Sequence, residues 1–162
     1  MMKSIPVWKQ ELSDGVHAAR LASLYCCSPA ETASEAARYT AVLDGLEKTF
    51  GSHAEAGLYS APGRTEIGGN HTDHQHGRVL AGSVNIDMIA AAAPNDKNQL
   101  RVQSEGYDLC VIDLNDLEAR KEEENTTAAL LRGECAAFTQ RGAKLAGLDV
   151  YVSSNVPKGS GV

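Results

Sequence analysis

The hydrophobic period of the sequence changes between residues 50 and 57, and this change limits the folds open to the chain. From Ala33 to Phe50 the apolar residues recur at the spacing of an amphipathic helix. Gly51 then supplies a helix stop. From Gly57 onwards, β-branched residues, glycines and turn formers replace the alanine-rich pattern. The sequence therefore predicts a helical front followed by strands.

Two helices are expected within residues 12–50. The apolar residues of the first are Leu12, Val16, Ala19 and Leu24. The second follows a helix-start pattern, with a capping Ser, then Pro, and Glu three residues after the Ser: Ser28-Pro29-Ala30-Glu31. A later helix is expected after Thr126, with an apolar stripe made of Leu130, Leu131, Cys135, Phe138 and Leu145.

Strand-forming segments fill much of the chain after residue 57. They are Leu58 to Ser60 running towards Ile67, Val79 to Ala93, Leu100 to Ser104, Cys110 to Leu114, and Leu148 to Asn155. Residues 83–88 alternate polar and apolar side chains, so we expect one face of that strand to be wet. Pro94 to Asn98 consists of turn residues and is expected to join the strands on either side of it as a hairpin.

Composition and charge exclude several classes of protein. The 162 residues suit one ordinary domain, and 15 basic against 21 acidic residues argue against a basic surface for nucleic acid. No apolar run is long enough for a membrane span, and no apolar stretch of signal-peptide type follows the basic start. We therefore expect a cytoplasmic protein that binds neither nucleic acid nor membrane.

The four cysteines form no CxxC pair and have no regular spacing. They are Cys26, Cys27, Cys110 and Cys135. This pattern argues against a structural zinc site and against a disulfide framework. Reduced, buried thiols are expected instead.

Polar side chains are densest in residues 63–77, a loop between two expected strands. The loop holds Arg64 and Glu66, and three of the five histidines fall within its sequence H-T-D-H-Q-H, residues 71–76. It allows three interpretations: a metal site, a solvated turn, or a site for a polyhydroxylated ligand. The histidine spacing matches no standard zinc pattern, and Arg64 would repel a cation, so no metal is expected. Carboxylate, amide, imidazole and guanidinium groups together suit a ligand rich in hydroxyls.

A second candidate loop follows the last expected strand, at residues 156–162 with the sequence V-P-K-G-S-G-V. A glycine-rich loop directly after a strand often leads into a helix whose N-terminus binds phosphate. The same residues also suit a flexible tail, and the loop by itself does not separate the two.

These two motifs resemble the galactokinases, members of the GHMP kinase superfamily. Residues 61–74 read A-P-G-R-T-E-I-G-G-N-H-T-D-H, against the galactokinase signature A-P-G-R-V-N-L-I-G-E-H-T-D-Y. Residues 156–162 resemble the first half of the superfamily's ATP motif, P-x-G-x-G-L-S-S-S-A. The resemblance covers about residues 42–162 and keeps the order of the two motifs.

The resemblance implies a fold and a reaction. The fold is the α+β N-terminal domain of GHMP kinases, a mixed sheet packed with helices that is similar to the second domain of ribosomal protein S5. With the helical pattern before it, the domains expected are a helical extension over residues 1–50 and a galactose-binding domain over residues 51–162, truncated at the ATP-binding loop. The reaction transfers the γ-phosphoryl group of Mg²⁺-bound ATP to the anomeric hydroxyl of α-D-galactose.

Residue roles follow by position in the motifs. Arg64 matches the arginine beside the catalytic base and the transferring phosphoryl group. Asn70, His71 and Asp73 match the residues that bind the sugar hydroxyls. The loop that binds the ATP phosphates matches Gly159, Ser160 and Gly161.

The sequence departs from the family pattern at three signature positions and in length. The family has Glu at position 70, Asn at position 66 and commonly Tyr at position 74, where this chain has Asn, Glu and His. The family's catalytic Asp, most ligands of Mg²⁺ and the C-terminal domain are expected beyond Val162, so we expect the chain by itself to be inactive. A kinase for a related sugar and a sugar-binding regulatory module without catalysis are the alternatives.

Overall fold

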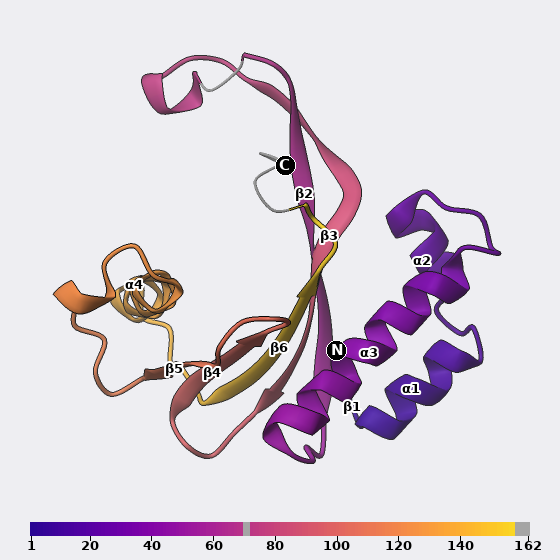
Figure 1. Cartoon of the computed structure of the whole chain (residues 1–162), viewed down its shortest axis with the longest axis horizontal. Coiled ribbons are helices and arrows are strands. Elements are labelled where there is room, and N and C mark those ends of the chain that lie inside the picture. The colour runs from indigo at the N-terminus through magenta and orange to yellow at the C-terminus, as the bar shows by residue number, and fades with distance from the viewer. Residues whose placement is uncertain (70–71, 158–162) are drawn as a thin grey trace.

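A long antiparallel pair of strands runs through the middle of the protein and extends beyond the rest of the sheet (Figure 1). The structure is a computed structural model that describes residues 1–69 and 72–157. Its sheet has the strand order β1-β2-β3-β6-β4-β5, and the β4–β6 pair is parallel while the other pairs are antiparallel. The strands are β1 (Met2–Lys3), β2 (Ala56–Gly68), β3 (Leu80–Pro94), β4 (Gln99–Ser104), β5 (Cys110–Asp113) and β6 (Leu148–Ser154).

Helices cover the two sides of this mixed sheet, which confirms the expected α+β fold with a mixed sheet packed with helices. The helices α1 to α3 lie on one side and α4 on the other (Figure 1). Their bounds are α1 (Ile5–Ser13), α2 (Ala18–Tyr25), α3 (Thr32–Phe50) and α4 (Thr127–Gln140), with short 3₁₀ helices η1 (Asp73–Gln75) and η2 (Lys121–Glu123). Within the described ranges, every helix is too short or too polar to cross a membrane.

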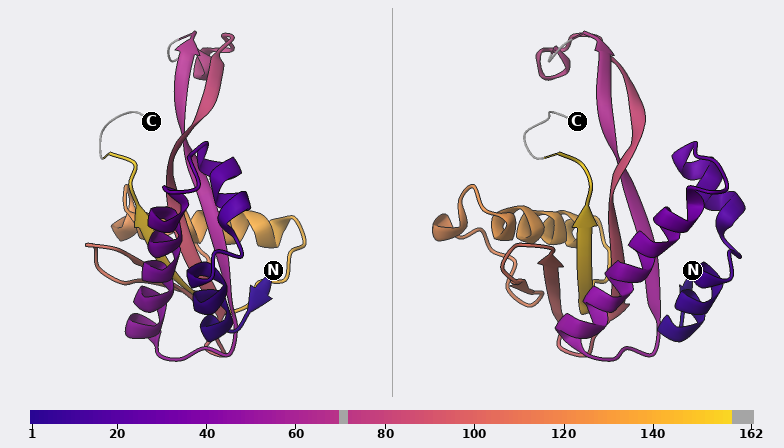
Figure 2. Two further views of the ribbon diagram at one scale, coloured as in Figure 1. Left: turned by 90° about the vertical axis from the view of Figure 1, so that its right-hand side faces the viewer. Right: turned by 45° about the vertical axis from the view of Figure 1, so that its right-hand side comes forward.

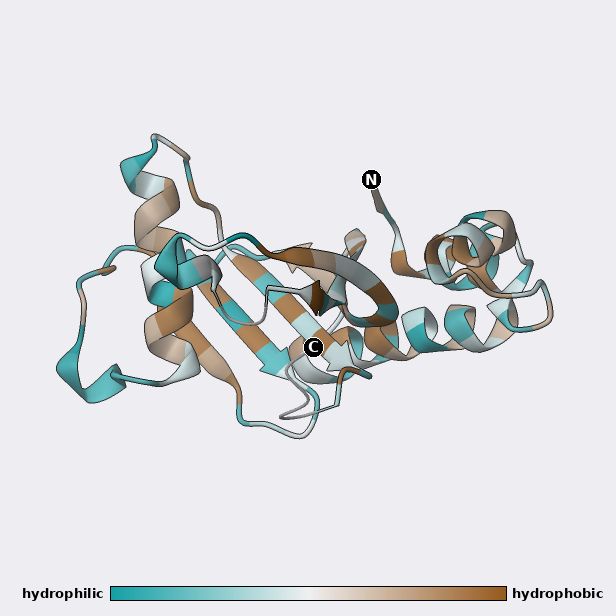
Figure 3. Ribbon diagram, turned by 90° about the horizontal axis from the view of Figure 1, so that it is seen from above, coloured by the Kyte–Doolittle hydropathy of each residue, from teal (hydrophilic) through white to brown (hydrophobic). Residues whose placement is uncertain are grey.

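The first 50 residues share one hydrophobic core with the sheet. Ile5 of α1 and Leu43 of α3 are buried together with Ile89 of β3. The Trp8 indole Nε1 donates a hydrogen bond to the Ala56 carbonyl at 2.8 Å, which ties α1 to the start of β2. Apolar and polar residues alternate along the central strands, as the brown and teal segments of Figure 3 show. The helical front is thus docked on the sheet.

Two helix boundaries differ from the sequence prediction. The stretch from Leu12 to Leu24 is not one helix, because Gly15 adopts a left-handed φ of 72° and separates α1 from α2. The pattern at Ser28 forms a turn ahead of α3, in which the Glu31 carboxylate accepts from the Ser28 N–H at 2.8 Å and from its hydroxyl at 2.7 Å. Gly51 ends α3 as expected, with φ of 88°.

The hairpin predicted around Pro94 to Asn98 is wrong. Strand β6 lies between β3 and β4, so the loop crosses over the start of β6 instead of returning beside β3. The Asn95 N–H donates to the Gly147 carbonyl at 2.9 Å. A Cβ at Gly147 would lie 2.7 Å from the Asn95 carbonyl oxygen, so this close approach requires glycine. The loop is therefore held against the chain that enters β6.

The prediction that the polar residues of 83–88 face solvent is also wrong at the end of this segment nearest the core. Asp87 is buried and Met88 is half exposed, the reverse of the expectation. Asp87 lies on the same side of β3 as the buried residues Ile89 and Ala91, because alternate residues of a strand share a face. The helical layer covers this side of β3 from Asp87 onwards.

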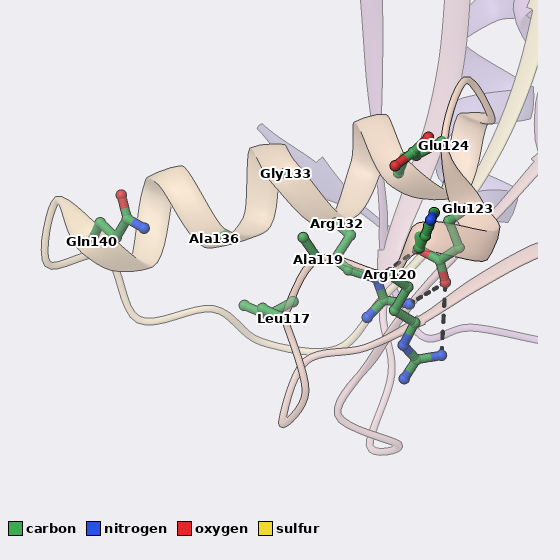
Figure 4. A pocket seen from close by; sticks show the side chains of 11 residues that line it. Leu117, Ala119, Arg120, Glu123, Glu124, Arg132, Gly133, Ala136 and Gln140 are labelled. Atoms are coloured by element: carbon green, nitrogen blue, oxygen red, sulfur yellow. Dashed lines mark hydrogen bonds and ion pairs between the residues drawn. The ribbon is translucent and has the colours of Figure 1, made fainter.

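Helix α4 begins as predicted, and its predicted apolar stripe is buried at Cys135 but not throughout. The Thr126 hydroxyl caps it by accepting from the Ala129 N–H at 3.3 Å. Leu130 and Phe138 are exposed, and the helix ends before Leu145. Arg132 is buried instead, since its Nε and Nη2 donate to the two carboxylate oxygens of Glu123 at 2.7 and 2.6 Å (Figure 4). Because of this bidentate ion pair, a charged residue of α4 is buried as well as Cys135.

The expected burial of the cysteines is confirmed for one residue of the four. All four thiols are free, and only Cys135 is buried, whereas Cys26 is exposed at the end of α2. Burial raises the pKa of the Cys135 thiol. The prediction of a buried thiol is thus wrong for Cys26.

A buried carboxylate at the start of β6 joins three neighbouring segments. The Asp149 carboxylate accepts from Arg101 Nε at 2.6 Å, from Asn95 Nδ2 at 2.6 Å, and contacts His53 Nε2 at 2.9 Å. Burial by itself would raise the pKa of Asp149, but these hydrogen bonds outweigh burial and hold that pKa below its usual value. Asp149 is therefore ionised in the neutral fold.

The packing of α3 on β6 predicts opposite effects for two glycine substitutions. A Cβ at Gly45 would lie 2.5 Å from the Tyr151 Cζ, whereas a Cβ at Gly133 of α4 meets nothing within 4 Å. Gly45→Ala should lower the free energy of unfolding by about 1–3 kcal/mol through overpacking. Gly133→Ala should raise it by up to about 1 kcal/mol, because Ala is the better helix former. Urea denaturation measures both, and stabilisation by Gly45→Ala would contradict the packing.

The lowered pKa of Asp149 predicts that acid destabilises the fold. A carboxyl with a lower pKa in the folded chain stabilises the fold above its unfolded pKa of about 3.9, and that stabilisation is lost as the pH falls through the folded pKa. The free energy of unfolding, measured in urea, should therefore fall below about pH 4. Asp149→Asn should lose about 3–5 kcal/mol at neutral pH, because Arg101 then faces an amide. That variant should show a weaker acid dependence; an unchanged dependence would rule out this role.

Candidate functional site

The polar segment of residues 63–77 lies at the far end of the β2–β3 hairpin, and its prediction as a loop is wrong for residues 63–68, which belong to β2. The hairpin projects past the sheet and carries the loop at its tip (Figure 2). Strand β6 pairs with β3 only from Met88 to Pro94, and β1 pairs with β2 only at Ala56 and Gly57. Among the described residues, the outer hairpin therefore has no further strand beside it, and many of its side chains are exposed.

Arg64 and Glu66 lie two residues apart on β2 and form an ion pair. Arg64 Nη2 donates to Glu66 Oε1 at 2.8 Å. The Arg64 side chain is 58% exposed and the Glu66 side chain 15%. The pairing orients Arg64 and leaves most of its guanidinium accessible, as recognition of an anionic ligand requires.

The tip of the hairpin is a turn built around Thr72. The Thr72 N–H donates to the Gly69 carbonyl at 3.1 Å, and the Gly77 N–H donates to the Thr72 carbonyl at 2.7 Å. Gly69 has a left-handed φ of 98°, and a Cβ at Gly77 would lie 2.6 Å from the Thr72 carbonyl oxygen. Both positions require glycine, Gly69 within the signature and Gly77 three residues after it.

The expected sugar-binding residues sit at this tip or outside the described part of the chain. Asp73 is the first residue of η1, and its backbone follows the Thr72 turn directly. Asn70 and His71 lie outside the described residues, as do Gly159, Ser160 and Gly161 of the second motif. Their expected roles therefore stay predictions.

The starts of the two motifs lie at the same level of the sheet, on opposite sides of β3. Ala61 pairs with Met88 of β3, and Met88 pairs with Ser154 of β6. Neighbouring strands are about 4.8 Å apart, so Ala61 and Ser154 are separated by roughly 10 Å. The signature starts at Ala61, and the glycine-rich loop starts two residues after Ser154. Segments about 95 residues apart in sequence, the difference between positions 156 and 61, are thus brought together.

A buried carboxylate that sequence reasoning missed lies at the base of this arrangement. Asp87 Oδ2 accepts from the Tyr25 hydroxyl at 2.5 Å and from the Ser60 hydroxyl at 2.6 Å, and Oδ1 accepts from Arg38 Nη2 at 2.8 Å. Burial would raise the pKa of Asp87, but the three donors outweigh it and hold that pKa below its usual range. Burial also raises the pKa of Tyr25, so that hydroxyl stays protonated as a donor.

One signal in the sequence could have found Asp87. It has the same strand parity as Ile89, Ala91 and Ala93, which form an apolar row. An acidic residue in line with an apolar row indicates a buried, paired carboxylate. No comparable local signal pointed to its partners Tyr25 and Arg38, which lie on helices far away in sequence.

A cavity of about 600 Å³ lies between α4 and the loop before it, and three of its charged residues, Arg120, Glu123 and Arg132, form ion pairs through Glu123 (Figure 4). That pairing makes it a structural feature of the helix attachment. Within residues 1–69 and 72–157, no group of three or more His, Cys, Asp or Glu side chains is arranged to hold a metal ion.

Comparison with known proteins identifies the signature. The family model described as the galactokinase galactose-binding signature matches residues 46–94. The galactokinase of Streptomyces coelicolor is 30% identical over 117 residues, covering 72% of this chain and 30% of that protein. The galactokinase of Ligilactobacillus salivarius is 32% identical over 123 residues, covering 74% of this chain and 31% of that protein.

A solved structure has the same fold. The Lactococcus lactis galactokinase complexed with galactose superposes with a TM-score of 0.65 at 21% identity, over 74% of this chain and 31% of that chain. These findings confirm the resemblance seen in the sequence. The chain is a relative of the galactokinases that carries their galactose-binding signature at residues 46–94 and spans about 30% of the length of the curated relatives it matches.

Proposed function

We propose that the polypeptide containing this chain is a galactokinase of the GHMP superfamily. It would transfer the γ-phosphoryl group of ATP to the anomeric hydroxyl of α-D-galactose. One observation carries the proposal: the row Ala61–Met88–Ser154 sets the start of the sugar signature and the start of the glycine-rich loop about 10 Å apart. This places the chain segments that carry the two motifs beside each other at their starts, as one site for two substrates requires, although the reacting atoms themselves must come within about 3–3.5 Å.

The tip of the hairpin supplies the sugar side of the site. An ionised Asp73 accepts hydrogen bonds from two sugar hydroxyls, and His71 and Asn70 bind further hydroxyls. Together these contacts fix the sugar ring, so that a single oxygen faces the phosphate. Orientation of this kind supplies much of the rate of phosphoryl transfer, in which the protein does little covalent chemistry.

Arg64 supplies positive charge beside the transferred group. A guanidinium has five N–H donors, and the Glu66 contact at 2.8 Å occupies one of them. The Arg64 side chain is 58% exposed, so its other donors are available to bind phosphate oxygens. Glu66 therefore orients Arg64 without removing its capacity to bind an anion.

The nucleotide side begins at residues 156–162. Backbone N–H groups of Gly159, Ser160 and Gly161 would hold the ATP phosphates. Magnesium ions neutralise phosphate charge in such reactions, and we assign no residue of this chain as a ligand of Mg²⁺. The catalytic base and a C-terminal domain of the same polypeptide are proposed to complete the site, and a cytoplasmic location stays a prediction.

One observation favours a second candidate, a kinase for a related sugar. Glu66 and Asn70 reverse the Asn and Glu of the galactokinase signature, so a carboxylate and an amide have exchanged places. Moving an anionic acceptor along the hairpin changes which hydroxyl pattern the site prefers. Comparison of galactose with other hexoses distinguishes the two candidates.

Galactose-dependent consumption of ATP by the full polypeptide is the first expected result, followed in a coupled assay. Asp73→Ala should raise the KM for galactose by about 10-fold or more, with a small effect on the KM for ATP, because a charged hydrogen-bond acceptor is lost on the sugar side. Equal changes in both KM values would remove Asp73 from the sugar site.

Two controls belong to this assay. Asp14→Asn changes an exposed carboxylate that accepts from Gln10 Nε2 at 2.9 Å at the end of α1, and it should leave both KM values unchanged. The 162-residue chain by itself should give no galactose-dependent turnover. The proposed catalytic base belongs to the rest of the polypeptide, and base catalysis alone is commonly worth about 10²–10⁴ in rate.

Arg64→Ala should reduce kcat by about 10²-fold or more, because charge stabilisation at the transferred group is lost. Glu66→Gln keeps the shape of the partner and should change kcat far less. Arg120→Ala is the matched control, because Arg120 is an exposed arginine paired with Asp116 at 2.6 Å beside α4. A kcat for Arg64→Ala equal to that of the control would exclude the proposed role.

A further inference from the structure

We propose that Asn155 is a positioning residue for the nucleotide, because its hydrogen bonds to Asp87 set the direction in which the chain leaves β6. The inference rests on the proposed function, since it takes residues 156–162 as the start of the ATP loop. Asp87 and Asn155 would then form the structural base of the nucleotide side, and both lie outside residues 61–74 and 156–162.

Asn155 holds Asp87 at two points. The Asn155 N–H donates to the Asp87 carbonyl at 3.2 Å, and the Asp87 N–H donates to Asn155 Oδ1 at 2.7 Å. The regular β3–β6 ladder ends at the pair Met88–Ser154. The Asn155 side chain therefore provides an acceptor at the point where the strand stops, and this extends the pairing of the two chains by one residue.

The Asp87 side of this contact is fixed from three directions. Its carboxylate is bound by Tyr25 at the end of α2, Arg38 in α3 and Ser60 in β2. Arg38 has a second partner, Glu35, at 2.6 Å, which holds its guanidinium in place. Because Asp87 is 2% exposed and fully paired, its backbone is an immobile anchor for Asn155.

Val156, the residue after Asn155, is also held by a hydrogen bond. The Val156 N–H donates to the Ser154 hydroxyl at 3.1 Å, so the chain turns at Asn155 with both of its neighbours restrained. Ser60 lies one residue before the signature, and Asn155 one residue before the loop. Both bind Asp87, so a single residue of β3 sets the base of both motifs.

This arrangement predicts a selective kinetic effect of removing the Asn155 side chain. Asn155 is exposed, so Asn155→Ala in the full polypeptide should leave the fold intact, as checked by urea denaturation. The variant should raise the KM for ATP by about 5-fold or more, the factor expected for one lost hydrogen bond, with the KM for galactose unchanged. A change of equal size in both KM values, or in neither, would overturn the proposal.

Asn115→Ala is the matched control. Asn115 is also an exposed asparagine just after a strand, β5, and its side chain accepts from Asn98 Nδ2 at 2.8 Å. It is remote from Asp87, so both KM values should match those of the unmodified protein. A rise in the KM for ATP in this control would show that the effect of Asn155→Ala is not specific.

Hydrogen exchange of the Asp87 amide in the 162-residue chain tests the contact without any activity. Exchange should become at least about 5-fold faster in Asn155→Ala and stay slow in Asn155→Asp, which keeps an acceptor oxygen at the same place. Equal exchange in both variants would overturn the contact itself. Absence of galactose-dependent turnover in the unmodified polypeptide would instead refute the proposed function, and the positioning role with it.

Discussion

The buried carboxylate of Asp87 is the interaction on which the arrangement of this protein depends. An ionised carboxylate removed from water is strongly unfavourable unless hydrogen-bond donors surround it. Here the donors come from α2, α3 and β2, so the charge is satisfied only when the helical layer and the strand pair adopt one relative position. Apolar packing around Leu43 and Ile89 supplies most of the burial, but it tolerates small sliding movements that a set of short hydrogen bonds does not.

This anchoring matters because the functional elements lie outside the core. The outer part of the β2–β3 hairpin has no third strand paired with it in the described ranges, and its shape comes from the pairing of two strands and from the glycine turn around Thr72. The position of the hairpin tip relative to the sheet therefore depends on how firmly the base of the hairpin is held. The base is where Ser60 binds Asp87, at the level at which the sheet passes from the buried part to the exposed part.

Two buried carboxylates on the adjacent strands β3 and β6, Asp87 and Asp149, stabilise opposite ends of the sheet. Asp149 binds Arg101 and Asn95 at the end of the sheet where β6 begins, and this fixes the loop that crosses over β6. Asp87 acts near the other end, where β6 stops. Strand β6 is thus secured at both ends, by a side-chain cluster at its entry and by the Asn155 contact at its exit. The point at which the chain leaves β6, at Asn155, is consequently fixed by contacts that reach across the sheet.

The sequence by itself determined the local elements and the family, because these depend on short-range signals. Gly51 ended α3, Thr126 capped α4, and the strand segments and the signature at residues 61–74 were readable from neighbouring residues. Only the tertiary structure decided which strands are neighbours, since β6 enters between β3 and β4 through contacts between residues far apart in the chain. The burial of Asp87 is of the same kind, because Arg38 lies 49 positions and Asn155 68 positions away from it. Caps and periodicities act within a few residues, whereas strand order and the satisfaction of a buried charge depend on the complete fold.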